Sequence, residues 1–528
     1  MPEKTVFTRE ATGLVREISA WKAFLFNLFF INPLLVLLWI AVGQALFPGA
    51  NFLISTLLAI IPSIIMMYMY AQFSVAFPRS GGDYVYVGRI LHPSLGLMGN
   101  FVVTLNFIST VGVNAAWVAS FGIGPTLAAL GTIYGDPSLA AMATAVTTSA
   151  ATFLIGTFFV IIVSAIVLFG TGVSFKVQNI LFVITFIAII AFIVSVAVTS
   201  RSDFVANFNS LSTISYNQVV STAQASGANL GINLSDTLGA VVYAVLAVLG
   251  YVGSAYVGGE VKNPKNSQLL GMLGSLLGYI VVMFIATLVT YTTMGREFLA
   301  SIGFLAVNGN SSYSLPVSLP ILTVLAGYGT KNPMLELLLG VGVVTTLMGG
   351  MLVLIFGCVR NLFAWSFDRI APVKLADVNE RFHSPHYSLF VLAAVGVLFV
   401  YLTVYTTVTA FLTYNVTAWF LVLALLGVAG IIFPRRKKET FDASPRIVNR
   451  KLAGVPVISI VGVLAIIDGL TMAYLSTLPA ISGPFNPYYI GMTVSWFIIG
   501  FALYWIAYTI QKKRGIAFEK IFSVIPPE

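Results

Sequence analysis

Residues 249–268, LGYVGSAYVGGEVKNPKNSQ, form the segment that decides the fold class of this chain. Four glycines interrupt its apolar part, and the polar sequence Glu260-Val-Lys-Asn-Pro follows at once. In a helix of a soluble core, each glycine would cost about 1 kcal/mol relative to alanine. A run of this kind therefore needs a structural reason, which the rest of the chain indicates.

The composition excludes a soluble globular protein. The chain has 528 residues, of which 58% are hydrophobic and only 9% charged, and its mean hydropathy is +0.96. Soluble domains are about 25% charged, so this chain lacks the polar groups to cover a surface in water. Its one cysteine, Cys358, excludes an internal disulfide and a cysteine-based metal site. We expect no cofactor, and the polar first residues predict no cleavable signal peptide.

Apolar runs long enough to cross a bilayer recur along the whole chain. About 20 apolar residues span the hydrocarbon layer as a helix. The sequence therefore predicts an all-α integral membrane protein with twelve transmembrane helices. The predicted spans cover residues 20–46, 51–77, 95–130, 151–170, 177–199, 236–259, 268–294, 335–359, 387–407, 411–433, 455–478 and 487–510.

The basic residues orient these spans. If the N-terminus is cytoplasmic, all but three of the 27 Lys and Arg residues fall on the cytoplasmic side, the exceptions being Arg201, Arg296 and Lys331. This asymmetry follows the positive-inside rule, so we expect both termini in the cytoplasm and a location in the cell (plasma) membrane. The net charge of +9 is then a topology signal, not a sign of nucleic-acid binding. The basic run after Pro434 is expected to face anionic lipid.

Two predicted spans contain helix breakers at their centres. Span six has the glycines of residues 247–253, and span one has Asn32 followed by Pro33. Irregular backbone inside a membrane survives only where protein or a watered cavity surrounds it. Broken helices five positions apart are typical of transporters built from inverted repeats, with two half-helices facing the midplane. The alternative is a simple proline kink together with glycine packing faces.

Three motifs resemble those of one transporter family, the amino acid–polyamine–organocation (APC) superfamily, of the amino acid permease type. The motifs lie where helix three begins and where helices six and eight end, and the resemblance spans nearly the whole chain. They are Gly81-Gly82-Asp83-Tyr84-Val85-Tyr86-Val87-Gly88-Arg89, Gly259-Glu260-Val261-Lys262-Asn263-Pro264 and Arg360-Asn-Leu-Phe-Ala-Trp-Ser-Phe-Asp368-Arg369-Ile-Ala-Pro372.

The resemblance implies a LeuT-type fold, in which two inverted repeats of five helices precede two extra C-terminal helices. It implies these parts: cytoplasmic segment 1–19, first repeat 20–199, external loop 200–235, second repeat 236–433, basic cytoplasmic loop 434–454, helices eleven and twelve 455–510, and cytoplasmic tail 511–528. It also implies that unwound backbone holds the carboxylate and amino groups of the substrate. The matching positions are Asn32, Pro33, Leu34, Ala247, Leu249, Gly250 and Tyr251.

The chain also departs from the family pattern. Helix one lacks the usual Gly-Ser/Ala-Gly triplet, and Asn32-Pro33-Leu34 stands in its place. Leu246 occupies a position where many members carry a gating aromatic residue, for which Tyr243 or Tyr251 is an alternative. These departures leave the substrate and the geometry of carboxylate binding open.

Charged residues near the cytoplasmic helix ends are candidates for an inner gate that pairs when the cavity faces outward. The alternative is that they are solvated loop charges, worth 0–1 kcal/mol each. The six candidates are Asp83, Arg89, Glu260, Lys262, Asp368 and Arg369.

Four residues are candidates for ion coupling. Thr185 stands where some proton-coupled members carry a lysine, and Thr345 and Thr346 could complete a Na⁺ site with carbonyls of helix one. Alternatively, these threonines bond to their own helix backbone. Asp468 lies deep in span eleven, where a carboxylate is either protonated and passive or a proton relay.

The resulting prediction is a secondary active transporter of amino acids that is coupled to H⁺ or Na⁺ and works by alternating access. Its expected partners are the amino acid, the coupling ion and membrane lipid. An amino acid exchanger, a polyamine or organic-cation carrier and a non-transporting receptor of the same fold remain alternatives. No nucleophile–base or nucleotide motif indicates an enzyme.

Overall fold

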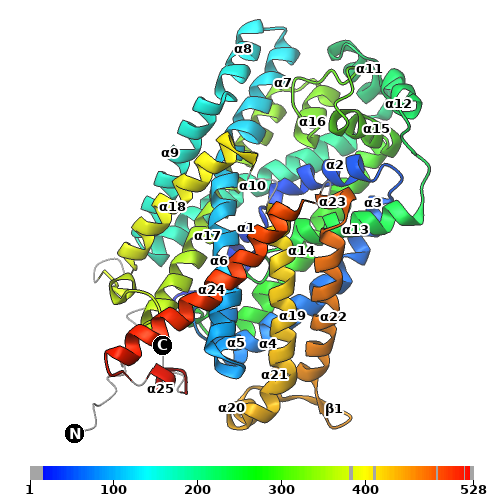
Figure 1. Cartoon of the computed structure of the whole chain (residues 1–528). Helices are drawn as coiled ribbons and strands as arrows, with labels where there is room; N and C mark the ends of the chain where they lie inside the picture. Colours follow the sequence, from blue (N-terminus) through cyan, green and yellow to red (C-terminus); the bar gives the residue numbers. More distant parts are fainter. Residues whose placement is uncertain (1–15, 380–383, 408–411, 483–485, 517, 524–528) are drawn as a thin grey trace.

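The computed structural model describes residues 16–379, 384–407, 412–482, 486–516 and 518–523, and these are almost entirely helical. The helices form one bundle (Figure 1). Helices α11, α12, α15 and α16 gather at one end, here called the upper end, while α5, α20, α21 and α25 lie at the opposite, lower end.

Ten helices in the described residues are long and apolar enough to cross a membrane. Two of them combine consecutive elements, namely α3 with α4 and α6 with α7. They are α3 (Phe52–Leu58) with α4 (Ile60–Ala76), α6 (Pro93–Trp117) with α7 (Gly124–Tyr134), α9 (Ser149–Leu168), α10 (Thr171–Val198), α14 (Pro264–Thr293), α17 (Pro333–Phe367), α18 (His386–Tyr405), α19 (Leu412–Arg436), α22 (Val457–Ser476) and α24 (Pro487–Lys513).

The first predicted span is bent. Helices α1 (Ala20–Ile31) and α2 (Val36–Leu46) meet at 43° and pass the length and hydropathy test only together, which brings the number of spans in the described residues to eleven. The predicted span at 236–259 contains α13 (Leu234–Val248), whose 15 residues are too few to cross a bilayer alone. Ten or eleven of the twelve predicted spans are therefore present as long apolar helices.

After α13, the chain differs from the prediction of two half-helices. It continues as two short 3-10 turns, η3 (Gly253–Tyr256) and η4 (Gly258–Glu260). Glycine lowers helix propensity, and a Cβ at Gly258 would lie 2.7 Å from the carbonyl oxygen of Arg79. Close backbone packing, and not a second half-helix, follows the break.

The predicted span at 95–130 is one helical unit of 42 residues, Pro93–Tyr134. A wider π turn, η2 (Val118–Ile123), joins α6 to α7 just before Pro125. Proline has no N–H to donate and crowds the preceding turn, which a π bulge accommodates without ending the helix.

The segment predicted as the external loop, residues 200–235, forms short helices, as do residues 295–334. Residues 200–235 contain α11 (Arg201–Leu211) and α12 (Tyr216–Ala225), and residues 295–334 contain α15 (Arg296–Val307) and α16 (Leu322–Thr330). The Tyr216 ring stacks on that of Phe298, with ring centroids 4.4 Å apart. Aromatic contacts of this kind join the two layers into one cap at the upper end (Figure 1).

The remaining elements are short. One is a two-residue hairpin in which Lys451 pairs with Pro456. These elements are α5 (Asp83–Ile90), α8 (Pro137–Val146), η5 (Val373–Ala376), α20 (Lys438–Ala443), α21 (Arg446–Asn449), β1 (Lys451–Leu452), β2 (Val455–Pro456), α23 (Pro479–Ser482) and α25 (Phe518–Ser523).

Large apolar side chains cover the outer faces of the bundle. Leu154 of α9 is 66% exposed and Ile467 of α22 is 58% exposed, and many residues of α10 and α24 are similar. By contrast, α1 packs against α14, α17 and η3 in the interior. An apolar exterior around a helical core indicates a multi-pass membrane protein.

Candidate functional site

The first helix break lies at Asn32 and Pro33. Asn32 has a left-handed backbone, with φ 61° and ψ 79°, and Pro33 opens the 3-10 turn η1 (Pro33–Leu35). Proline disfavours helical geometry at the residue before it and cannot donate a backbone hydrogen bond, so α1 ends here.

The N–H groups at this break already have acceptors. Asn32 donates to the carbonyl oxygen of Phe29 and Leu35 donates to that of Asn32, at 3.0 and 2.9 Å. The Leu34 N–H donates to Thr346 Oγ1 at 3.3 Å. Since the proline has no N–H, residues 32–35 offer no unpaired backbone donor to a ligand.

The second break follows α13 and touches the first. Leu249 has an extended backbone, and Gly250 has φ 133°, a conformation that only glycine adopts readily. A Cβ at Gly250 would lie 2.9 Å from the carbonyl carbon and oxygen of Phe30. The missing side chain therefore allows the two breaks to meet.

A hydrogen-bond network fixes the unwound segment after the second break. The Ser254 N–H donates to Asn27 Oδ1 at 2.6 Å, and Asn27 Nδ2 donates to Ser254 Oγ at 3.1 Å. Ser254 Oγ in turn donates to Gln268 Oε1 at 2.6 Å. By contrast, the N–H groups of residues 250–252 have no acceptor among the described residues. The segment is thus held by α1 and α14 while its first amides remain unpaired.

A cavity of about 640 Å³ lies against both breaks. Its lining extends from the breaks toward the upper end of the bundle, to Val42 of α2, to Thr147 after α8 and to Ser149 at the start of α9. No charged residue is among those that line it. Most of its wall is aromatic or aliphatic, with aromatic side chains from Phe30, Trp39, Phe107, Trp117, Tyr243 and Trp419. The volume and apolar wall are typical of a small-molecule site.

The predicted substrate residues divide into two sets. Asn32 and Leu249 line the cavity. Of the two tyrosines considered as a gating aromatic, Tyr243 lines the cavity and Tyr251 does not. The other predicted residues shape the breaks without lining the cavity, namely Pro33, Leu34, Ala247, Gly250 and Tyr251.

Three polar residues of α6 line the cavity and were missed by the sequence analysis. Asn106, Thr110 and Asn114 lie on one helix face because they are four residues apart. Polar residues four positions apart inside an apolar span were the feature of the sequence that could have predicted this polar face of the cavity. The Asn114 side chain is buried, and its Nδ2 has no partner among the described residues.

The three candidate threonines lie near the first break. Thr185 and Thr345 place their hydroxyl oxygens 3.0 Å apart, and Thr345 Oγ1 donates to the carbonyl oxygen of Gly342 at 3.0 Å. Thr346 accepts from the Leu34 N–H. The structure thus places three hydroxyl oxygens beside the break. Thr345 also forms the bond to its own helix backbone that the sequence analysis gave as the alternative to ion binding.

Asp468 lies on α22, away from the cavity. Asp468 is 8% exposed, and its Oδ2 atom has no hydrogen-bond partner among the described residues. The hydroxyl of Tyr251 lies close enough to interact electrostatically with this carboxyl group. Asp468 therefore lies near Tyr251 of the second break, without a hydrogen bond between the two side chains that the described residues show.

Two of the gate candidates form a buried ion pair at the lower end. Arg89 Nη2 donates to both carboxylate oxygens of Asp368, at 2.9 and 2.8 Å. The Tyr84 hydroxyl donates to Asp368 Oδ2 at 2.6 Å, and the Arg89 guanidinium lies 4.7 Å from the ring centroid of Phe522 in α25. These contacts join α5, α17 and α25.

Glu260 forms a second buried ion pair, with a partner that the sequence analysis did not select. Arg360 Nε donates to Glu260 Oε1 at 2.5 Å, and both side chains are 1% exposed. Thr171 Oγ1 donates to Glu260 Oε2 at 2.8 Å. The Glu260 carbonyl oxygen also accepts from the N–H groups of Glu17 and Ile18. This pair therefore ties η4 to α10, to α17 and to the segment before α1.

The other three gate candidates have different surroundings. Asp83 is 1% exposed, and its carboxylate accepts from Asn100 Nδ2 at 3.5 Å and lies beside the Tyr256 hydroxyl. Burial raises the pKa of Asp83 to about 6. The Lys262 side chain is exposed. The carbonyl oxygen of Arg369 accepts a hydrogen bond from Gln511 Nε2 at 2.9 Å. None of these three forms an ion pair within the described part of the chain.

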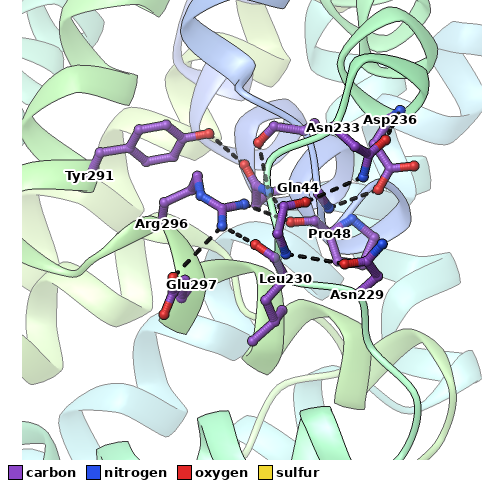
Figure 2. Close-up of polar contacts among 12 residues, drawn as sticks. Gln44, Pro48, Asn229, Leu230, Asn233, Asp236, Tyr291, Arg296 and Glu297 are labelled. Atoms are coloured by element: carbon purple, nitrogen blue, oxygen red, sulfur yellow. Dashed lines mark hydrogen bonds and ion pairs between the residues drawn. The ribbon is translucent and has the colours of Figure 1, made fainter.

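A polar cluster at the upper end joins the outer halves of the two broken helices (Figure 2). Arg296 of α15 donates to the carbonyl oxygens of Pro48 and Leu230. The Tyr291 hydroxyl of α14 donates to Gln44 Oε1 at 2.5 Å. These contacts hold the turn after α2 against α14 and α15.

The same cluster reaches the first turn of α13. Asn233 caps this helix by accepting from the Asp236 N–H at 2.8 Å, and Asp236 Oδ2 accepts from the Gly49 N–H at 2.8 Å (Figure 2). The Asn233 N–H donates to the Gly49 carbonyl oxygen at 3.0 Å. Helices α2 and α13 are thus tied together at their upper ends.

Comparison with known proteins agrees with the three motifs. The family model described as "Amino acid permease" matches residues 18–511. The chain is 25% identical to the branched-chain amino acid permease BcaP of Lactococcus lactis subsp. cremoris (strain MG1363) over 473 residues, 89% of each chain. It is 23% identical to the methylthioribose transporter of Bacillus subtilis (strain 168) over 82% of each chain, and 23% identical to BcaP of that organism over 64% of each. The chain therefore belongs to the amino acid permease family of the APC superfamily.

Proposed function

We propose that this protein is a secondary active transporter that carries amino acids across the cytoplasmic membrane by alternating access. Its family and its relatives are those of transporters, not enzymes. The observation that carries the proposal is the cavity against two helix breaks that touch at Gly250 and Phe30. Unwound backbone at membrane depth is typical of substrate sites between the repeats of such carriers. We infer the five-plus-five inverted repeat on the same basis.

The chemistry of the cavity favours neutral amino acids with apolar side chains. Its aromatic and aliphatic wall suits such side chains, and no carboxylate is among the lining residues to hold a polyamine or another organic cation. Two relatives are named for branched-chain amino acids, which makes leucine, isoleucine and valine the first substrates to test. The relative named for methylthioribose makes an uncharged sugar thioether the second class.

The closed and open ends of the cavity support an alternating-access cycle. The buried pairs Arg89–Asp368 and Glu260–Arg360 lie toward the lower end, which the charge distribution predicts to be cytoplasmic. The cavity extends toward the upper end. We infer that this conformation faces outward and that both pairs separate when the cavity opens to the cytoplasm.

Coupling to H⁺ or Na⁺ is part of the proposal. Hydroxyl oxygens of Thr185, Thr345 and Thr346 near the first break are the kind of oxygen ligand that a hard cation takes. The alternative is a proton carried by Asp468, whose buried carboxyl group lies near Tyr251. An exchanger without ion coupling would need neither group.

Uptake of labelled leucine into proteoliposomes tests the function. An inward proton gradient, an inward sodium gradient and internal unlabelled leucine should be imposed separately, with empty liposomes as control. Accumulation under one ion gradient supports symport with that ion, and uptake only against internal leucine supports exchange. If well-folded protein transports no amino acid under any of the three conditions, the proposed function is wrong.

A further inference from the structure

A second cavity lies at the lower end of the bundle, where Figure 1 shows α5 and α25. Its volume is about 390 Å³, and no described residue lines both this cavity and the one against the helix breaks. Four of its described lining residues are charged, namely Arg89, Arg436, Lys437 and Glu519. The cavity against the breaks has no charged lining residue, so the two cavities suit different classes of ligand.

Two basic side chains of the lower cavity are not used by the fold. The charge of Arg89 is compensated by Asp368. By contrast, the side chains of Arg436 and Lys437 form no hydrogen bond or ion pair within the described part of the chain. Among the described lining residues, Glu519 is the one acid that opposes them. The cavity wall therefore carries an excess of positive charge, which suits an anion.

His92 lies beside these charged groups. Burial and the positive charge of Arg436 lower the pKa of His92, while the negative charge of Glu519 raises it. Because these three residues belong to the start of α6, the end of α19 and α25, the fold brings them together from distant parts of the chain. The Ser94 N–H donates to His92 Nδ1 at 3.2 Å, so a neutral ring carries its proton on Nε2. That atom is a further donor for an anion.

An apolar stripe of α24 leads to the same place. Ile498, Phe501 and Trp505 are exposed and lie three and four residues apart, so they share one face of the helix. The Trp505 ring stacks on that of His92, with ring centroids 6.0 Å apart and an angle of 22° between the ring planes. Tryptophan is enriched at the boundary between membrane and water. The cavity therefore lies where the head groups of lipids meet their chains.

We propose that the lower cavity binds the phosphate head group of an anionic phospholipid whose chains lie along the stripe of α24. Arg436 and Lys437 pair with the phosphate, and His92 Nε2 donates to it. Hydrogen bonds between ionised groups are the stronger kind, and basic pockets between membrane helices hold anionic head groups in this way. A free phosphate ion would use the same basic side chains and leave the apolar stripe unoccupied.

The proposal is narrower than a general attraction between lipid and the basic run after Pro434. It assigns two residues of that run to a defined cavity, whereas Arg435 and Lys438 are exposed and do not line it. It is also independent of the transported substrate, because the cavity against the breaks takes no part in it.

Binding of short-chain lipids to the purified, detergent-solubilised full chain tests the site, with native mass spectrometry to count bound lipids during a titration. Dioctanoyl phosphatidylglycerol has a net negative charge. Dioctanoyl phosphatidylcholine has the same chains and a phosphate but no net charge, and inorganic phosphate supplies the anion without chains. The unsubstituted protein should bind phosphatidylglycerol about 10-fold or more tightly than either of the other two, because only this lipid satisfies both the basic wall and the apolar stripe.

Two double variants separate the cavity from the rest of the basic run. Arg436→Gln with Lys437→Gln removes two charges from the cavity wall, and the affinity for phosphatidylglycerol should fall about 30-fold. Arg435→Gln with Lys438→Gln is the matched control, because it removes the same charge from the same run outside the cavity. It should bind phosphatidylglycerol nearly as the unsubstituted protein does. Thermal unfolding of each variant shows whether it is folded.

Each other outcome overturns the proposal. If the control variant loses as much affinity as the cavity variant, general attraction to the basic run explains the binding. If phosphatidylcholine binds as tightly as phosphatidylglycerol, the cavity does not recognise charge, and if inorganic phosphate does so, the cavity holds a free anion and not a lipid. Absence of phosphatidylglycerol binding to the folded, unsubstituted protein also refutes the site. None of these results affects the leucine uptake that tests the transport function.

Discussion

Breaking the Glu260–Arg360 pair should destabilise the protein and open its lower end. The change to make is Glu260→Gln, with Arg360→Met and the double variant beside it. Both side chains are 1% exposed, and Nε lies 2.5 Å from Oε1. Arg360 Nη1 and Nη2 have no hydrogen-bond partner among the described residues, so Glu260 supplies the compensating charge that the structure shows.

The magnitude follows from this burial. Removal of one partner of a buried pair leaves an uncompensated charge and costs about 3–5 kcal/mol. In the structure, Thr171 and Arg360 donate to the Glu260 carboxylate. Arg360→Met removes one of these donors and leaves the Thr171 hydroxyl. The double variant leaves no charge, and neutral replacement of a buried pair is often nearly neutral in stability. Each single variant should therefore be less stable than the double variant.

The chain contains its own reporter for this experiment. Cys358 is the only cysteine, is fully buried, and precedes Arg360 by two residues on α17. A fluorogenic maleimide should react with it on thermal unfolding, which gives the midpoint temperature of each variant. At room temperature, the rate of the same reaction measures how often the lower end opens. We expect faster labelling in both single variants than in the unsubstituted protein.

Two results would refute this reasoning. If the double variant loses as much stability as the two single variants combined, the two residues do not compensate each other. If the single variants are less stable but label at the rate of the unsubstituted protein, the pair stabilises the fold without closing a gate.

Three further predictions follow from the breaks, from Asp83 and from the coupling candidates. Gly250→Ala should abolish transport, because its Cβ would meet the Phe30 backbone at 2.9 Å and φ is 133°, whereas Gly278→Ala has open space and should transport normally in the same uptake assay. The pKa of Asp83 is about 6 when folded and near 3.8 when exposed, so the folded state binds the proton more tightly. The free energy of unfolding should then fall by about 2 kcal/mol as the pH rises from 4 to 6, and Asp83→Asn should remove this slope in thermal unfolding measured against pH. Asp468→Asn should abolish accumulation driven by a proton gradient if Asp468 carries the proton, and Thr346→Val should instead abolish accumulation driven by sodium. Normal ion-driven uptake in both variants would exclude these two residues from coupling.

Local chemistry made the helix breaks predictable from the sequence. Pro33 removes a donor wherever it stands in a helix, and Gly250 allows a backbone conformation that other residues resist. Both effects act within a few residues, so both breaks occur where the sequence predicted them. The apolar runs were predictable for the same reason, since hydropathy over about 20 residues is a local property.

Contacts between distant segments could not be predicted in this way. Glu260 pairs with Arg360 across 100 residues, and Lys262, two residues from Glu260, is exposed instead. The sequence offers a positive charge near each candidate acid and does not say which one faces it. Asn114 was missed because polar residues in a membrane helix often bond to neighbouring helices, and only the packed bundle shows that this one faces a cavity.

The departure of helix one from the family pattern and the polar stripe on α6 have one physical explanation. Glycines at a helix break leave backbone N–H groups free for a ligand, but Pro33 removes one donor and Thr346 occupies the next. A carrier that loses these donors must recognise the substrate's charged ends by other groups or accept a different substrate. The polar side chains of Asn106, Thr110 and Asn114 line the cavity beside the breaks and are candidates for this role. Side chains change more readily by substitution than backbone geometry does, so substrate selection in this protein should depend on these polar side chains of α6 more than on the breaks themselves.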